Sequence, residues 1–163
     1  MEIEPIGDER GSFARTWCRR EFHTLGLNTL VEQTGTSLNL RKGTLRGMHY
    51  QAVPHEEVKL VRCTRGAIYD VIIDLRSESK TFQKWFGVEL TEENYRMLYV
   101  PEGYAHGFQT LSDRTEVVYH TSEFYTPNAE QGIRYNDVAF GIRWPLEVRV
   151  ISEKDKNWPD FSV

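Results

Sequence analysis

The chain has 163 residues, a mass of 19.1 kDa, a formal net charge of −4 and a sequence pI of about 5.8. This length suits one domain with its own core and is too short for two ordinary domains, so residues 1–163 are predicted to form a single domain. The acidic balance gives no bulk attraction to nucleic acid or to an anionic membrane, so any bound phosphate must be held by local Arg and Lys.

The composition favours a folded protein without disulfide bonds. Hydrophobic residues make up 39% and aromatic residues 12% of the chain, enough to fill a barrel or sandwich. Cys18 and Cys63 lie far apart without a CxxC spacing, so both are predicted to be free thiols. No apolar run is long enough to span a bilayer, and the N-terminus lacks the features of a signal peptide, so we expect a cytoplasmic protein.

In chain order, the first expected element is a helix near residues 19 to 26, and β-rich runs then dominate. The runs 58 to 64 and 67 to 75 flank Arg65-Gly66, which is typical of a hairpin turn. Thr91 begins a predicted turn of helix at 91 to 94. Further strands are expected at 85 to 90, 96 to 100, 106 to 111 and 115 to 121. The spacing predicts an all-β sandwich, jelly roll or closed barrel.

The run 67 to 75 has an unusual pattern. Strand alternation puts Ile68, Asp70, Ile72 and Asp74 on one face. Acids interleaved with isoleucine are compatible with a solvent face that carries two β-branched residues. They are equally compatible with the lumen of a barrel that holds a polar ligand, and the pattern alone leaves both open.

The residues suited to acid–base chemistry gather in segments 45 to 51, 100 to 108 and 152 to 155, with Lys59 and Tyr119 between them. A histidine such as His49 becomes an oriented general base when a carboxylate lies beside it, and Asp155 is a candidate for that carboxylate. Tyr119 could return a proton from another wall. Lys59 could place positive charge beside a developing enolate oxygen.

Six strings together resemble the dTDP-4-dehydrorhamnose 3,5-epimerase family, in order from about residue 7 to residue 155. They are 7–13 (GDERGSF), 44–51 (TLRGMHYQ), 59–62 (KLVR), 69–76 (YDVIIDLR), 100–108 (VPEGYAHGF) and 152–155 (SEKD). The resemblance implies a cupin-type jelly-roll barrel with a few short helices. It also implies a homodimer in which the N-terminal segment reaches towards the neighbouring subunit's site.

The resemblance carries roles over to individual residues. His49 matches the catalytic base, Asp155 its partner, Tyr119 the acid and Lys59 the residue near the enolate oxygen. Arg10 and Arg46 match positions that meet the diphosphate, where a guanidinium suits phosphate oxygens. Arg15 stands close to the nucleoside, Gln33 and His106 line the pocket and Asp70 supports it. Phe13 and Tyr125 complete the substrate-binding set.

The implied activity inverts C3, C5 or both in a nucleotide-linked 4-keto-6-deoxyhexose, within deoxysugar or surface-polysaccharide biosynthesis. The carbonyl acidifies the neighbouring C–H bonds because it delocalises the carbanion, so a base, an oxyanion stabiliser and an opposing acid suffice, and no cofactor or metal is expected. Inversion removes a proton from one face and returns one to the other. The base and the acid should therefore be different residues on opposite walls.

Several features of the chain differ from the family pattern and leave the nucleotide and the dimer contact open. Family members commonly carry Glu at the position of Arg15 and Asn at that of Gly35, so dTDP is the expected nucleotide and CDP or GDP the alternatives. The chain also begins later than most relatives, so we expect a shorter edge or a different dimer contact.

The rival from another class is a metal-dependent cupin oxygenase or isomerase. It would use two histidines and Glu56 or Glu57, but Gln51 stands where such sites have a second His, and Lys59 would oppose a cation. A binding module without catalysis would require the loss of His49, Tyr119 or Asp155, and all three are present.

Overall fold

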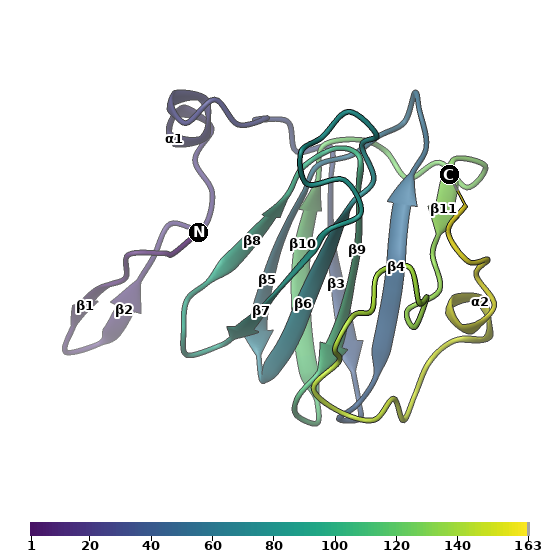
Figure 1. The fold of residues 1–163 in the computed structure, drawn as a ribbon. Coiled ribbons are helices and arrows are strands. Elements are labelled where there is room, and N and C mark those ends of the chain that lie inside the picture. Colours follow the sequence, from purple (N-terminus) through teal and green to yellow (C-terminus); the bar gives the residue numbers. More distant parts are fainter. Residues whose placement is uncertain (163) are drawn as a thin grey trace.

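The computed structural model describes residues 1–162 and contains two facing antiparallel β-sheets (Figure 1). The four-stranded sheet has the order β3 (Gln33–Asn39), β10 (Thr115–Thr121), β5 (Lys59–Arg65) and β8 (Met97–Val100). The five-stranded sheet has the order β11 (Glu130–Gly132), β4 (Leu45–Gln51), β9 (Tyr104–Thr110), β6 (Ala67–Asp74) and β7 (Trp85–Thr91). Two short helices, α1 (Arg19–Thr24) and α2 (Glu153–Lys156), complete the elements outside the N-terminal arm.

The order of the strands identifies the architecture. The chain changes sheet at every connection from β3 to β6, makes one hairpin between β6 and β7, and changes sheet again at every connection to β10. Two nested Greek keys of this kind form a jelly roll. The predicted all-β, cupin-type jelly-roll barrel with a few short helices is therefore confirmed.

The core lies between the two sheets. Its members come from strands of both, and they are Val61, Cys63, Ile68, Ile72, Leu90, Leu98, Val100, Phe108 and Val117. Asp70 and Asp74 are fully buried, so the alternative of a solvent-facing side of β6 is wrong. A second cluster, which includes Val71 and Ile73, packs the other face of β6 against the C-terminal segment. Both faces of β6 are thus covered, and Asp70 points into the barrel interior.

The predicted hairpin at Arg65-Gly66 is wrong, although both flanking strands exist. Arg65 pairs with Glu116 in one sheet, whereas Ala67 pairs with Thr91 in the other, so the turn is an arch between sheets. Gly66 has a φ of 77°, a conformation that glycine adopts without strain. The sequence marks a sharp turn there but does not mark which partner each strand takes.

Smaller differences concern the ends of elements. Residues 92–94 form a turn rather than a turn of helix, yet the Thr91 hydroxyl accepts the backbone N–H of Asn94 at 2.9 Å, as a cap would. The strand expected at 106 to 111 begins earlier, at Tyr104. The helix expected near 19 to 26 and the strand at 115 to 121 are confirmed.

The cysteines are free thiols, as predicted. Cys63 lies in the core between the sheets, and burial raises the pKa of its thiol to about 11. The thiol is therefore protonated near neutral pH and serves as a packing group. No helix in residues 1–162 has the length and apolar character needed to cross a membrane.

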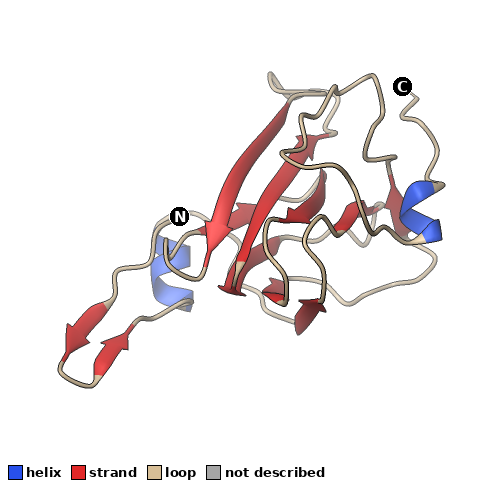
Figure 2. Cartoon of the chain, turned by 90° about the horizontal axis from the view of Figure 1, so that it is seen from below, coloured by secondary structure: helices blue, strands red, loops and turns tan. Residues whose placement is uncertain are grey.

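An N-terminal arm stands outside the barrel. Its hairpin, β1 (Ile6–Asp8) and β2 (Gly11–Phe13), projects from the side of the molecule in both views (Figures 1 and 2). Ile6 is 73% exposed and Phe13 is 65% exposed. Behind the hairpin, Ile3 and Phe22 pack on Leu60 and Met97, which fastens the base of the arm to the outer face of the four-stranded sheet. The hairpin itself has no such packing.

Candidate active site

A cavity of about 480 Å³ opens between the two sheets, next to the apolar core. Val61, Phe108 and Val117 belong both to the core and to the cavity wall. Seven of the residues predicted from the sequence line it, namely Gln33, Arg46, His49, Lys59, His106, Tyr119 and Tyr125. A cavity of this size, with apolar walls and convergent polar groups, is typical of a small-molecule site.

The backbone of β4 explains why Arg46 and His49 both reach this cavity. Residues three apart on a regular strand face opposite sides, but the pairing of β4 with β9 shifts register between Arg46 and His49. Gly47 allows the irregularity, because it has a φ of 129° and its missing Cβ would lie 2.5 Å from the Cα of Gly107. The two strands therefore approach closely, and a cation and an imidazole share one wall.

His49 is held by a buried carboxylate. Its Nε2 lies 2.6 Å from Asp155 Oδ1, and Asp155 Oδ2 accepts the backbone N–H of Gly47 at 3.3 Å. Asp155 is only 4% exposed. When Nε2–H donates to the carboxylate, the neutral ring carries its lone pair on Nδ1, the tautomer that a base requires.

Helix α2 positions the carboxylate. Ser152 precedes the helix, and its hydroxyl accepts the backbone N–H of Asp155 at 3.0 Å. Burial raises the pKa of Asp155, but the hydrogen bond and charge of His49 and the N–H of Gly47 outweigh it, so this pKa lies below its ordinary value. Asp155 therefore stays ionised beside the imidazole.

Tyr119 faces the same cavity from the opposite sheet. It lies on β10 of the four-stranded sheet, whereas His49 lies on β4 of the five-stranded sheet. The neighbouring His120 points away from the cavity and contacts the Thr34 hydroxyl at 2.8 Å, as strand alternation predicts. An acid on one wall and a base on the other is the arrangement that inversion at a carbon requires.

Lys59 reaches the cavity from β5 and pairs with Glu57 at 3.0 Å. Both side chains are largely buried. An ammonium that is fixed by a neighbouring carboxylate is a localised positive charge, suited to an oxyanion that forms nearby. The sequence did not indicate that Glu57 holds Lys59.

His106 lines the cavity and forms a second His–Asp pair with Asp70 behind it. His106 Nε2 lies 2.7 Å from Asp70 Oδ1, and Asp70 is fully buried. Asp70 therefore contacts a lining residue from behind and does not itself line the cavity. Its Oδ2 has no hydrogen-bond partner among residues 1–162.

Gln51 uses its whole side-chain amide to join loops around the cavity. Its Nε2 group is within donating distance of the carbonyls of His55 and Phe124 and of a Glu57 oxygen, and its Oε1 accepts the backbone N–H of Thr126 at 2.7 Å. Within the described residues, no three His, Cys, Asp or Glu side chains gather in a group that could hold a metal ion. At the position where a metal cupin has a ligand, this chain has a structural amide.

Two further charged residues of the site were missed by sequence reasoning. Glu130 lies on β11 at the cavity, accepts the Tyr125 hydroxyl at 2.6 Å and forms an ion pair with Lys154. Burial raises the pKa of Glu130, but Lys154 and Tyr125 outweigh it and lower it below the ordinary value. Lys154 lies within the SEKD string, whereas the sequence around Glu130 carries no signal that places it beside Tyr125.

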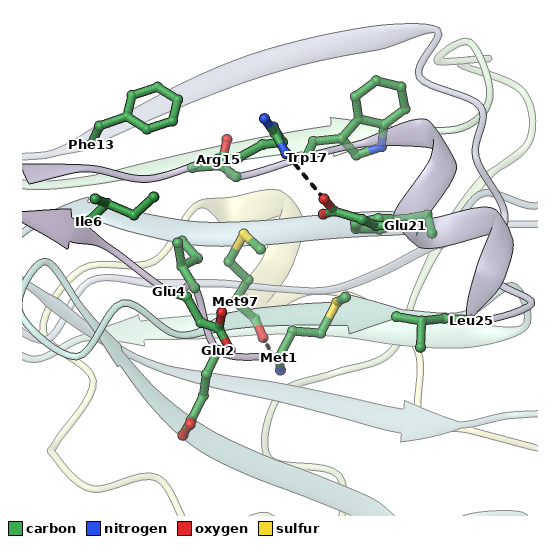
Figure 3. A pocket seen from close by; sticks show the side chains of 13 residues that line it. Met1, Glu2, Glu4, Ile6, Phe13, Arg15, Trp17, Glu21, Leu25 and Met97 are labelled. Atoms are coloured by element: carbon green, nitrogen blue, oxygen red, sulfur yellow. Dashed lines mark hydrogen bonds and ion pairs between the residues drawn. The ribbon is translucent and has the colours of Figure 1, made fainter.

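Arg10, Phe13 and Arg15 do not reach the cavity of their own chain. Arg10 lies at the tip of the arm and pairs with Asp8. Phe13 and Arg15 line a separate hollow of about 390 Å³ between the arm, α1 and Met97, where Arg15 lies 3.2 Å from Glu21 (Figure 3). Within a single chain, these three residues are thus separated from the other nine of the twelve predicted site residues.

Comparison with known proteins agrees with this geometry. The family model described as dTDP-4-dehydrorhamnose 3,5-epimerase matches residues 1–162. A protein of that name from Shigella flexneri is 44% identical over 162 residues, which cover 99% of this chain and 89% of the relative.

Solved structures extend the likeness to three dimensions. An enzyme of that name from Bacillus anthracis, with TDP and PPi bound, has a TM-score of 0.96 and 39% identity, covering 98% of this chain and 91% of that one. A dTDP-6-deoxy-D-glucose-3,5-epimerase from Legionella pneumophila, in complex with dTDP-4-keto-L-rhamnose, has a TM-score of 0.89 and 38% identity, covering 94% and 82%.

Proposed function

The chain belongs to the dTDP-4-dehydrorhamnose 3,5-epimerase family, and on that premise we propose that it inverts C3, C5 or both in a dTDP-linked 4-keto-6-deoxyhexose. One observation carries the proposal: the His49–Asp155 pair and Tyr119 face one cavity from opposite sheets. That geometry suits removal of a proton from one face of a sugar and return of a proton to the other. The enzyme is then an isomerase of deoxysugar biosynthesis.

In the proposed reaction, His49 Nδ1 takes the proton from the carbon beside the ketone. The C–H electron pair moves into the C–C bond as the carbonyl becomes an enolate, and Lys59 stabilises the negative oxygen. Tyr119 then gives its hydroxyl proton to the same carbon from the opposite face. The resulting imidazolium and phenolate return to neutral forms by proton exchange with water, so the reaction needs no external oxidant or reductant.

We assign the remaining cavity residues to substrate binding. Arg46 is held by Asn39 at 2.7 Å through its Nε, and its planar guanidinium suits diphosphate oxygens. The Gln33 side chain accepts the backbone N–H of Tyr125 at 2.7 Å, which joins β3 to the loop that carries an exposed aromatic ring. Tyr125 is suited to contact a nucleoside base, and His106 to contact the sugar.

A deuterium experiment tests the function. The protein is incubated in deuterated water with dTDP-, CDP- and GDP-linked 4-keto-6-deoxyhexoses, and the products are analysed by NMR. We expect deuterium at C3, C5 or both in the dTDP sugar, together with inversion of at least one of the exchanged carbons. The absence of exchange and inversion in all three substrates would overturn the proposed function.

We also propose a homodimer in which the arm of one subunit serves the cavity of the other. The support is the projecting, poorly packed hairpin (Figure 2), together with the finding that neither Arg10 nor Phe13 lines the cavity of its own chain. The partner subunit would then bring the missing guanidinium and aromatic ring to the rim. Under this proposal the exposed Ile6 and Phe13 become buried on assembly.

A mixing experiment tests the exchange of arms. Arg10→Ala and His49→Asn are each expected to have little activity alone, because one lacks the arm contact and the other lacks the base. Subunits of the two variants, unfolded together and reassembled, should recover about a quarter of wild-type activity, since half of the dimers are mixed and one of their two sites is intact. No recovery from a reassembled mixture would show that each arm serves its own chain.

Replacing Arg15 tests the nucleotide assignment. In this chain Arg15 pairs with exposed Glu21 at the base of the arm, and such a pair contributes little free energy. We expect Arg15→Glu to change the Kd of dTDP by less than about threefold and to keep dTDP preferred over CDP. Calorimetry with both nucleotides, and with Glu21→Gln as the matched control, measures this. A tenfold change in base preference would instead place Arg15 at the nucleoside.

Exhaustive chelation separates the proposal from the metal-dependent cupin alternative. Gln51 is committed to hydrogen bonds with loops, and Lys59 would repel a cation in the same cavity. We therefore expect full epimerase activity after prolonged dialysis against a chelator, with metal content measured by mass spectrometry. A loss of activity that iron, manganese or zinc restores would favour the metalloenzyme.

A further inference from the structure

Trp158 lies beside the His49–Asp155 pair, just beyond the short helix that carries Asp155. The centroids of its indole and of the His49 imidazole are 6.3 Å apart, and the planes of the two rings are inclined at 68°. This is the edge-to-face arrangement that aromatic pairs prefer. Trp158 is half-buried and does not line the cavity, so it contacts the base from outside the substrate space.

The indole rests on the strand next to the base. Gly132 of β11 is directly opposite His49 of β4 in the antiparallel register. A Cβ at Gly132 would lie 2.2 to 2.4 Å from three atoms of the indole. The ring therefore packs on the bare backbone of β11, with no side chain between them.

The chain that follows Trp158 is tied to the domain. The Pro159 carbonyl accepts the backbone N–H of Arg134 at 3.3 Å, and the backbone N–H of Phe161 donates to Asp137 Oδ2 at 2.6 Å. The Phe161 ring packs against the hydrophobic cluster on the outer face of β6. These contacts hold the indole in one place relative to the pair.

The indole also lies against the carboxylate. Burial raises the pKa of Asp155, and the Trp158 N–H is one of the groups that lower this pKa, after His49 and the backbone N–H of Gly47. The Trp158 Nε1 atom is buried and has no hydrogen-bond partner among residues 1–162. Trp158 thus acts on Asp155 by packing and by its N–H dipole, without a formed hydrogen bond.

We propose that Trp158 is a positioning residue for the base, and that its indole keeps water away from the hydrogen bond between His49 Nε2 and Asp155. This inference rests on the proposed function and adds a determinant outside the cavity. Water that reached the pair would compete for both groups and weaken their mutual attraction. The imidazole would then be held less firmly, and a misplacement of about 1 Å costs on the order of a hundredfold in rate.

Proton NMR of the substrate-free protein tests the cover directly. A ring N–H that donates to a buried carboxylate exchanges slowly with water and gives a low-field resonance, which His49→Asn identifies by its loss. Trp158→Ala should broaden this resonance through faster exchange, whereas Trp158→Phe should retain it because a ring still covers the pair. The resonance of His106, which pairs with buried Asp70, is the internal reference and should not change.

Kinetics in deuterated water measure the effect of the cover on the reaction. In Trp158→Ala, kcat for exchange and kcat for inversion should fall together by between about tenfold and a hundredfold, because both need the base. KM should change by less than about twofold, since Trp158 does not line the cavity. Trp158→Phe should stay within about threefold of wild type.

The matched control is Trp85→Ala. Trp85 is another half-buried tryptophan, and it lies on β7 at the opposite edge of the same sheet from β11. Its truncation should lower thermal stability but leave kcat and the His49 resonance unchanged. A fall of kcat in both variants would indicate general destabilisation and would overturn the positioning role.

Other outcomes also contradict the proposal. An unchanged resonance or an unchanged kcat in folded Trp158→Ala would overturn it, as would an equal loss in Trp158→Phe. If Trp158→Ala does not fold, Gly132→Ala keeps the tryptophan but displaces its indole from β11, and an unchanged His49 resonance there would overturn it too. Failure of the proposed function is distinguishable, because wild-type protein would then show neither exchange nor inversion while the resonance still responded to Trp158→Ala.

Discussion

His49→Asn is expected to abolish both deuterium exchange and inversion, with a rate loss on the order of a thousandfold. Asparagine keeps a polar group of similar reach but has no lone pair of sufficient basicity to take a proton from carbon. Without that step no enolate forms, and Tyr119 has nothing to protonate. The measurement is NMR of the dTDP-linked substrate in deuterated water, followed for both hydrogen loss and product.

The same substitution also removes a partner from a buried carboxylate, so folding has to be measured with it. Asp155 would keep the Gly47 N–H but lose the imidazole, and an unpaired buried charge destabilises the native state. Thermal unfolding of the variant reports this cost. His23→Asn, on the exposed side of α1, is the matched control and should leave activity unchanged. Deuterium exchange that persists in folded His49→Asn would show that another residue is the base.

Tyr119→Phe is expected to separate the two proton transfers. The ring remains and still lies over Gly35, so packing changes little, but the only group assigned to protonate the opposite face is gone. Exchange through His49 should continue, while inverted product should fall by about a hundredfold or more. The ratio of exchange to inversion is therefore the diagnostic quantity.

The control for this variant is another tyrosine-to-phenylalanine change outside the cavity. Tyr135 is not among the cavity residues, so Tyr135→Phe should keep the wild-type ratio. Normal epimerisation by Tyr119→Phe would remove Tyr119 from the mechanism. A parallel loss of exchange and inversion would instead assign it to substrate binding.

The sequence predicted the barrel because the β-rich runs and turns are local signals. It did not predict strand partners, as the wrong hairpin at Arg65-Gly66 shows: the local pattern of an arch and of a hairpin is the same, and only long-range pairing decides between them. The face of β6 was ambiguous for a similar reason. Aspartates that alternate along a strand usually indicate a solvent-exposed face, and only the structure shows that Asp70 and Asp74 are buried.

The residues of the site were predicted through a resemblance to a family. The spacing of these residues in the sequence could not predict which of them lie on the same wall of the cavity. Arg46 and His49 share a wall only because of the irregularity at Gly47, which strict alternation does not foresee. The structural roles of Glu57 and Glu130 were missed because they depend on contacts made in the folded chain, chiefly those with Lys59 and Tyr125. Glu57 and Lys59 are two residues apart, but Glu57 precedes β5, so strand alternation alone does not place the pair on one face. Arg10, Phe13 and Arg15 all fall outside the cavity of one chain. The predicted roles of Arg10 and Phe13 remain tied to the proposed dimer, whereas Arg15 pairs with Glu21 at the base of the arm.

The contact between His49 and Asp155 joins residues 106 positions apart in the chain. Contacts of such high contact order form only after the intervening chain has been organised, because closing a long loop costs entropy before the contact returns any free energy. Every strand of both sheets precedes α2 in the chain, so during synthesis on the ribosome a closed cavity with its histidine can exist before its carboxylate has emerged. On refolding, we therefore expect the circular dichroism of the strands to recover before deuterium exchange does. The appearance of activity then marks the completion of folding rather than its onset.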